Sequence, residues 1–306
     1  MSGINVSDEK TKEEIGNVLR RFKHMLGNSI DSEKPMKEAP ARDEFVGTPK
    51  ARPRRFIYHP EHAEFAKTHI AKLLRLGCVE RAHNPPFSFP FLVVKKTDGT
   101  FRGVIDLRAY NDCVKAIQVG DADYRLALLR MRGSKCFATL DLADAFWQVP
   151  LADSQVYIQT NDGVYRCLRV PQGARNATAH LHNALVQVLD ELIGNGVELY
   201  VDDLLLHHET EDGLLELLER VFSRFEKFGV VVKLKKSVFF VNVVRWCGLL
   251  LSATGFKKDP KNLFNFMRVD APKNAQELQQ VLGQQGLAKI EQDTKRFFGT
   301  PLEERT

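Results

Sequence analysis

The chain has 306 residues, 43% hydrophobic and 27% charged, which is the composition of an ordinary globular protein. No apolar run approaches the roughly 18 residues of a membrane span, and residues 1–10 are too polar for a secretory signal. We therefore expect an intracellular protein, cytoplasmic or nuclear, with no membrane partner. Five widely separated cysteines argue against a disulfide framework or a zinc site, and the net charge of +5 suits a polyanionic partner.

The first fifty residues divide into two parts. Apolar residues at spacings of four, three and four predict a helix over 8–26. From residue 27 to residue 55 the composition turns to Pro, Ser, Lys and Glu, which predicts a linker without a fold of its own. Residues 1–50 are therefore interpreted as an N-terminal helix followed by a flexible linker.

A basic hairpin is predicted next. A helix over 60–76 ends at Gly77, and strands over 91–96 and 101–107 flank an Asp-Gly turn. Between residues 51 and 108 we count eleven bases against five acids, so this region is a candidate phosphate-facing surface. The alternative is a solvated sheet edge that carries charge to prevent aggregation.

The remaining elements alternate without a regular βαβ rhythm. A hairpin over 156–170 precedes a helix to about residue 193, and a second amphipathic helix covers 213–228. Short strands are expected over 238–244 and 245–251, with Gly255 ending that module, and a further helix starts at Asn274. This order favours an α+β fold, a sheet covered by helices, over a doubly wound parallel fold.

Three carboxylates occupy the ends of apolar strands. Asp202 and Asp203 stand between two apolar runs and predict a β-hairpin with a two-residue acidic tip, and Asp141 follows the apolar strand 136–140. Brought together, these like charges repel one another, and a hard cation such as Mg²⁺ removes the conflict. The alternative is an ordinary solvated Asp-Asp turn.

Two motifs about sixty residues apart carry a family resemblance. Tyr200-Val201-Asp202-Asp203 and the segment 140–151, with Pro171-Gln172-Gly173 between them, resemble the reverse transcriptases of LTR retrotransposons (gypsy-type) and retroviruses. The likeness runs from about residue 52 to residue 283 in the family's motif order. It implies a right-hand polymerase with fingers and palm over 51–253, the palm being an antiparallel sheet backed by helices, and a partial thumb over 254–306.

The resemblance also implies an activity and its catalytic residues. The activity is RNA-directed DNA polymerisation, in which dNTPs are added to a primer 3′-hydroxyl on an RNA or DNA template with two Mg²⁺ or Mn²⁺ ions. Asp141 and Asp202 are the expected metal ligands, and Lys236 is the expected proton donor to pyrophosphate. Asp203 is placed beside them as a weaker ligand, because adjacent strand residues point to opposite faces.

Further residues are assigned to the substrates by the same resemblance. Phe146 corresponds to the aromatic gate that excludes a 2′-hydroxyl, and Gln172 to a residue lying against the incoming nucleotide. The other expected nucleotide contacts are Lys96, Arg102, Asp144 and Ala145, and the expected primer-grip residues are Trp246 and Gly248.

The match weakens after Gly173. Thr178 replaces the usual proline, residues 179–182 depart from the usual aromatic-Gln ending, and the motif around Lys236 is poorly kept. Two alternatives therefore stay open: a catalytically inactive, reverse-transcriptase-like protein that binds nucleic acid, and a metal-dependent phosphohydrolase. The template preference and the oligomeric state are not fixed by the sequence.

Overall fold

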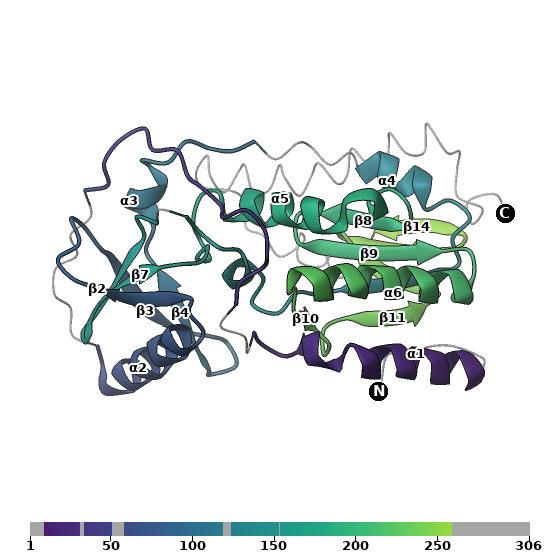
Figure 1. Ribbon diagram of the computed structural model, residues 1–306, viewed down its shortest axis with the longest axis horizontal. Helices are drawn as coiled ribbons and strands as arrows, with labels where there is room; N and C mark the ends of the chain where they lie inside the picture. The colour runs from purple at the N-terminus through teal and green to yellow at the C-terminus, as the bar shows by residue number, and fades with distance from the viewer. Residues whose placement is uncertain (1–8, 31–33, 51–57, 119–123, 153, 259–306) are drawn as a thin grey trace.

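Two lobes lie side by side in the computed structural model, which describes residues 9–30, 34–50, 58–118, 124–152 and 154–258 (Figure 1). One lobe is built on a five-stranded sheet and the other on a four-stranded sheet, each packed against helices. The expected α+β class is confirmed. None of the helices in the described ranges is long and apolar enough to cross a membrane.

The elements have the following bounds. The helices are α1 (Glu9–Arg21), α2 (Pro60–Arg75), α3 (Arg108–Asn111), α4 (Tyr124–Arg130), α5 (Ala177–Leu189) and α6 (Glu211–Phe228), with short 3₁₀ helices η1 (Lys23–Met25), η2 (Ala145–Gln148) and η3 (Asp190–Leu192). The strands are β1 (Leu26–Gly27), β2 (Val79–Ala82), β3 (Phe89–Lys95), β4 (Phe101–Ile105), β5 (Cys136–Leu140), β6 (Tyr157–Thr160), β7 (Gly163–Cys167), β8 (Val197–Tyr200), β9 (Asp203–His208), β10 (Val232–Lys233), β11 (Val238–Val241), β12 (Val243–Trp246), β13 (Leu249–Ser252) and β14 (Gly255–Lys258).

The first lobe contains the basic hairpin. Its strand order is β2-β7-β6-β3-β4, and α2 packs on the sheet through Ala66, Ile70 and Leu73. The predicted helix and hairpin are both confirmed. Val94 pairs with Arg102, and side chains two residues apart share a face, so Lys96 and Arg102 lie on the same exposed face.

The second lobe contains the acidic hairpin. Its antiparallel strand order is β11-β5-β9-β8, and α5 and α6 cover one face (Figure 1). The alternation along β9 sends Leu204 and Leu206 into the core under these helices and Leu205 into a second cluster on the other face. That second cluster also contains residues of α4 and of the β12-β13-β14 sheet.

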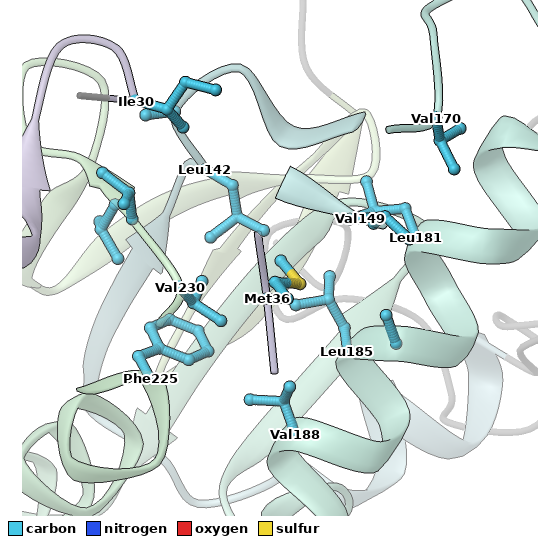
Figure 2. Packing of buried hydrophobic residues seen from close by; sticks show 14 of the residues in the cluster. Ile30, Met36, Leu142, Val149, Val170, Leu181, Leu185, Val188, Phe225 and Val230 are labelled. Carbon is cyan, nitrogen blue, oxygen red and sulfur yellow. The ribbon is translucent and has the colours of Figure 1, made fainter. Parts of the chain in front are cut away.

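The two long helices of the second lobe follow their predicted apolar stripes. Leu181, Leu185 and Val188 of α5 are buried, and Figure 2 shows them in one core with Phe225 of α6. The α6 helix begins where the Thr210 side chain accepts a hydrogen bond from Gly213 N, and it ends at Gly229, whose φ is +74°.

The N-terminal helix is shorter than the sequence predicts. The α1 helix ends at Arg21, after which β1 pairs in parallel with β10, because Leu26 and Gly27 satisfy their backbone groups in that ladder. The buried face of α1 is therefore Thr11, Ile15 and Val18, and Phe22 is buried directly after the helix.

Residues 34–50, which we call the strap, correct the expectation of a flexible linker. The strap has no helix, but Met36 N donates to Gln148 O at 2.8 Å and Ala41 N to Pro150 O at 2.8 Å. Met36 is 2% exposed and lies among Leu142 and Val230 in the core (Figure 2). Backbone hydrogen bonds that composition does not reveal thus fix the strap to the second lobe.

The C-terminal strands also differ from expectation. The run expected as one strand over 245–251 bends at Cys247-Gly248 and belongs to both β12 and β13. Gly255 begins β14, which pairs with β13, instead of ending the module. A thumb boundary at residue 254 would cut this hairpin, and the helix expected from Asn274 lies outside the described residues.

Candidate active site

Asp141 and Asp203 meet at one end of the β5–β9 ladder. Leu140 pairs with Leu204 in antiparallel register, so the next residues along, Asp141 and Asp203, face each other on the same side of the sheet. Both line a pocket of about 270 Å³. The sequence prediction that distant carboxylates converge is supported for this pair.

The acidic hairpin turns one residue earlier than predicted. Tyr200 pairs with Asp203, so the two-residue turn is Val201-Asp202, and Val201 has a φ of +62°. A positive φ is rare for a β-branched residue, which is why propensity placed the turn at the two aspartates. Both aspartates are exposed, but Asp202 lies at the tip of the turn and Asp203 lies in the strand opposite Asp141.

The carboxylates repel one another. Partial burial raises the pKa of Asp203, and the charges of Asp202 and Asp141 raise it further. The ammonium of Lys236 lies 3.7 Å from Asp141 Oδ2. Carboxylates whose negative charges repel one another fit a hard divalent cation, because the cation offsets that repulsion. The described part of the chain nevertheless holds no group of three side chains already placed to bind a metal ion.

The β12–β13 turn closes the other side of the pocket. Cys247 and Gly248 have φ of +48° and +78°, the left-handed geometry of a tight hairpin turn. Trp246 is 4% exposed, and its Nε1 donates to Asp203 O at 3.2 Å. The predicted primer-grip residues Trp246 and Gly248 therefore line the pocket, and the indole also anchors the acidic strand.

Residues that the sequence reasoning missed also support the site. Asp141 N donates to Ser237 Oγ at 3.1 Å, and Lys233 N donates to Asp141 O at 2.7 Å. Arg245 and Cys247 line the pocket, and burial raises the pKa of the Cys247 thiol. Their positions flanking Trp246 in a hairpin were the signal that could have indicated them.

The residues expected near the nucleotide start three positions after Asp141. Asp144 has a φ of +46°, and its carboxylate accepts a hydrogen bond from Ser29. Ala145 and Phe146 follow in η2 and are partly buried against the core.

None of the expected nucleotide contacts, Asp144, Ala145 and Phe146 included, lines the pocket. Lys96 and Arg102 lie on the hairpin of the first lobe, and Gln172 is exposed in the loop before α5. Asn111 Nδ2 donates to Gly173 O at 3.1 Å and so holds that loop to α3.

Comparison with known proteins identifies the family. Residues 94–285 match the family model described as "Reverse transcriptase (RNA-dependent DNA polymerase)". The chain belongs to the reverse transcriptase family. The α+β arrangement of its two lobes is accordingly that of a right-hand polymerase, and most of the residues expected to form a partial thumb lie outside the described part of the chain.

The chain resembles parts of much longer Pol and Pro-Pol polyproteins. It is 29% identical over 222 residues to the Retrovirus-related Pol polyprotein from transposon opus of Drosophila melanogaster, which covers 70% of this chain and 22% of the polyprotein. It is 29% identical over 242 residues to the Pro-Pol polyprotein of Simian foamy virus type 1, and the match covers 78% of this chain and 21% of that polyprotein. The chain thus spans about a fifth of the length of these relatives.

A solved structure shares the fold. The foamy viral protease-reverse transcriptase dRH, solved in complex with ds DNA, superposes with a TM-score of 0.77 at 25% identity. The superposition covers 94% of this chain and 50% of that one.

Proposed function

We propose that this chain is an RNA-directed DNA polymerase of a retroelement, a nucleotidyltransferase that adds dNTPs to the 3′-hydroxyl of a primer on an RNA or DNA template. The observation that carries the proposal is the meeting of Asp141 and Asp203 in one pocket with Lys236 and the β12–β13 turn. Fingers and palm run in this proposal from residue 51 to the end of β14 at residue 258, preceded by the strap, with the thumb after β14.

Asp141, Asp202 and Asp203 would hold Mg²⁺ or Mn²⁺. Two such ions, when bound, make the primer hydroxyl more acidic and stabilise charge on the leaving pyrophosphate. The raised pKa of Asp203 supports this assignment, because a cation at that carboxylate offsets the repulsion from Asp141 and Asp202.

The remaining residues of the chain would bind and orient the substrates. Lys96 and Arg102, on one face of their hairpin, bind the β- and γ-phosphates, the first as a point charge and the second as a planar fork. Phe146 excludes a 2′-hydroxyl, the backbone of Asp144 and Ala145 approaches the triphosphate, and Gln172 lies against the nucleotide.

Residues on the other side of the pocket would act on the primer end. Trp246 and Gly248 position the primer backbone from the β12–β13 turn. Lys236, exposed and 3.7 Å from Asp141, donates a proton to the departing pyrophosphate.

The test is dTTP incorporation by the purified chain on a poly(rA) template with an oligo(dT) primer, in Mg²⁺ or Mn²⁺. Asp202→Asn is the inactivating variant, and Asp212→Asn, an exposed acid in the first turn of α6, is the matched control. We expect metal-dependent extension that Asp202→Asn abolishes and Asp212→Asn retains.

An absence of extension by a folded chain that still binds the duplex would replace this proposal with an inactive, nucleic-acid-binding scaffold. Binding alone does not discriminate, because phosphate contacts make either protein bind in a salt-dependent manner.

A further inference from the structure

Residues 26–30, which we call the N-terminal arm, are carried to the edge of the proposed nucleotide site. The arm pairs with β10 through Leu26↔Val232, and the same β10 residue bridges to Leu142. Strand β10 therefore pairs with both the arm and the segment that follows Asp141. Ile30 is 5% exposed and is buried in the same core as Leu142 (Figure 2), so the arm is anchored on both sides of Ser29.

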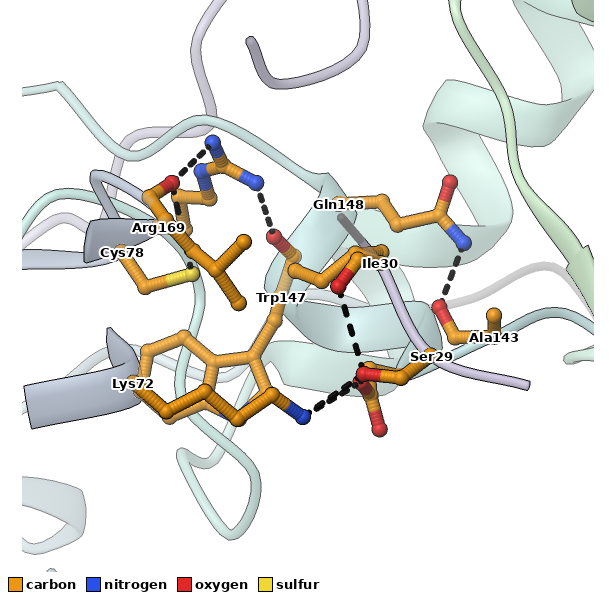
Figure 3. Close-up of polar contacts among 10 residues, drawn as sticks. Ser29, Ile30, Lys72, Cys78, Ala143, Trp147, Gln148 and Arg169 are labelled. Carbon is orange, nitrogen blue, oxygen red and sulfur yellow. Dashed lines mark hydrogen bonds and ion pairs between the residues drawn. The ribbon is translucent and has the colours of Figure 1, made fainter. Parts of the chain in front are cut away.

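Ser29 joins two charged groups that come from different lobes. Lys72 of α2 donates from Nζ to Ser29 Oγ at 2.6 Å, and Ser29 Oγ lies 2.6 Å from Asp144 Oδ2 (Figure 3). The ammonium of Lys72 is itself 3.6 Å from Asp144 Oδ2. The three side chains thus form one contact between the arm, the fingers and the palm.

The position of Asp144 gives this contact a consequence for the nucleotide. In the proposed function the Asp144 backbone approaches the triphosphate, so its own carboxylate places a negative charge beside a polyanion. The Asp144 side chain is 34% exposed and the Lys72 side chain 40% exposed, so solvent only partly screens that charge. The neighbouring Asp141 adds to the negative potential, whereas Lys72 and the Ser29 hydroxyl reduce it.

We propose that Lys72 and Ser29 are positioning residues of the nucleotide site, which neutralise Asp144 and hold its carboxylate so that a dNTP triphosphate can bind beside it. This inference rests on the proposed polymerase function and extends it to the N-terminal arm, which precedes the matched family region at residue 94. Lys72 acts through Asp144 and does not contact the phosphates.

The test is a double-substitution cycle on the full chain. Lys72→Met, Asp144→Asn and the double variant are compared for KM and kcat with dTTP, and Asn at residue 144 retains the left-handed backbone. We expect Lys72→Met to raise KM on the order of tenfold with kcat changed less than twofold. The double variant returns KM to within about threefold of the unsubstituted chain, because the uncompensated charge is gone.

Two further variants separate this role from a general effect. Lys227→Met removes the same charge from an exposed position of α6, outside the basic region 51–108, and is expected to leave KM unchanged. Ser29→Ala keeps every charge, removes only the bridging hydroxyl and is expected to raise KM about threefold, so it remains informative if Lys72→Met does not fold.

A parallel binding measurement keeps the inference testable apart from activity. Titration of inorganic tripolyphosphate with Mg²⁺ by calorimetry is expected to show weakened binding in Lys72→Met and recovered binding in the double variant. If the chain does not polymerise, the proposed function fails while this titration still decides the role of Lys72. Additive effects, unchanged KM and affinity in Lys72→Met, or no tripolyphosphate binding at all would each overturn the inference.

Discussion

Two carboxylates of this molecule, Asp43 on the strap and Asp203 in the acidic hairpin, respond to partial removal from water in opposite ways. Burial raises the pKa of Asp43, but hydrogen bonds donated by His180, Tyr110 and Asn176 outweigh it, so the pKa lies below the ordinary value. Burial raises the pKa of Asp203 as well, and there Asp202 and Asp141 add to the increase. A carboxylate that accepts hydrogen bonds from the surrounding fold, as Asp43 does, has a structural role. A carboxylate that faces only like charges, as Asp203 does, can bind a cation.

The Asp43 cluster also accounts for a departure from the family pattern. His180 lies in the altered segment 179–182, and its Nε2 is 2.9 Å from Asp43 Oδ1 in a pair whose side chains are 7% and 4% exposed. Asn176 donates to the same oxygen at 2.7 Å. The substituted residue therefore joins the strap to the first turn of α5, a contact that the family motif does not indicate.

The largest expected effect is on catalysis. Asp141→Asn removes one of the two facing acids and should reduce dTTP incorporation by at least about a hundredfold, because transition-state charge loses its cation. Steady-state kinetics with Asp212→Asn as control measures this. Retention of more than a tenth of the activity would show that the facing pair does not carry the reaction.

The next effect is on stability. Asp43→Asn leaves the His180 and Tyr110 groups without their charged acceptor in a buried site and should lower the free energy of unfolding by about 3 kcal/mol. Urea unfolding at constant m-value measures it. Because the folded pKa of Asp43 is lowered, this contribution is full above the ordinary Asp range and is lost as pH falls through the folded pKa.

A change of less than about 1 kcal/mol in Asp43→Asn at pH 7 would show that the neutral amide satisfies the same donors, and the contrast with Asp203 would fail.

Divalent cations should stabilise the chain through the Asp141–Asp203 pair and not through the Asp43 cluster. Mg²⁺ at ten times its Kd should stabilise the chain by about 1.4 kcal/mol, and Asp141→Asn should lose this gain while Asp43→Asn keeps it. Thermal unfolding with NaCl at matched ionic strength as control measures the difference. Equal stabilisation of all three proteins would indicate nonspecific cation binding.

The smallest expected change in stability is a gain. Asp203→Asn removes a repelled charge and should raise Tm slightly at pH 7 without metal, while abolishing activity. Because the folded pKa of Asp203 is raised, the cost of ionising it disappears as pH falls below that pKa, so the gain should shrink in acid. A lower Tm for Asp203→Asn would mean that the acidic pair is stabilising as it stands.

Elements with strong apolar periodicity could be predicted from the sequence, and contacts through the backbone could not. The stripe of α5 and the Asp-Gly hairpin of the fingers indicate their structures directly, since Leu181 and Leu185 are buried and Gly99 has a φ of +82°. Strand β2 and helix α4 were not predicted, because each is too short to show a period. The strap was missed because its order depends on partners far away in the sequence.

The candidate site shows the same division. The motifs indicated Asp141, Asp202 and Asp203 and ranked Asp202 above Asp203 as the partner of Asp141, whereas the strand register places Asp203 opposite Asp141. That register depends on Val201 adopting a left-handed backbone, which the motif does not reveal. The contact of Ser29 with Asp144 joins residues more than a hundred positions apart, and no local pattern encodes it.

The pairing of β1 with β10 has a consequence for biosynthesis. Leu26 and Val232 are about two hundred residues apart, and the same β10 strand supplies the Lys233 amide that holds Asp141. A ribosome adding roughly 5–20 residues per second needs about 10–40 s to make that stretch. During this time β1 has no partner, so the first lobe can fold while the N-terminal arm and the backbone of Asp141 wait for β10.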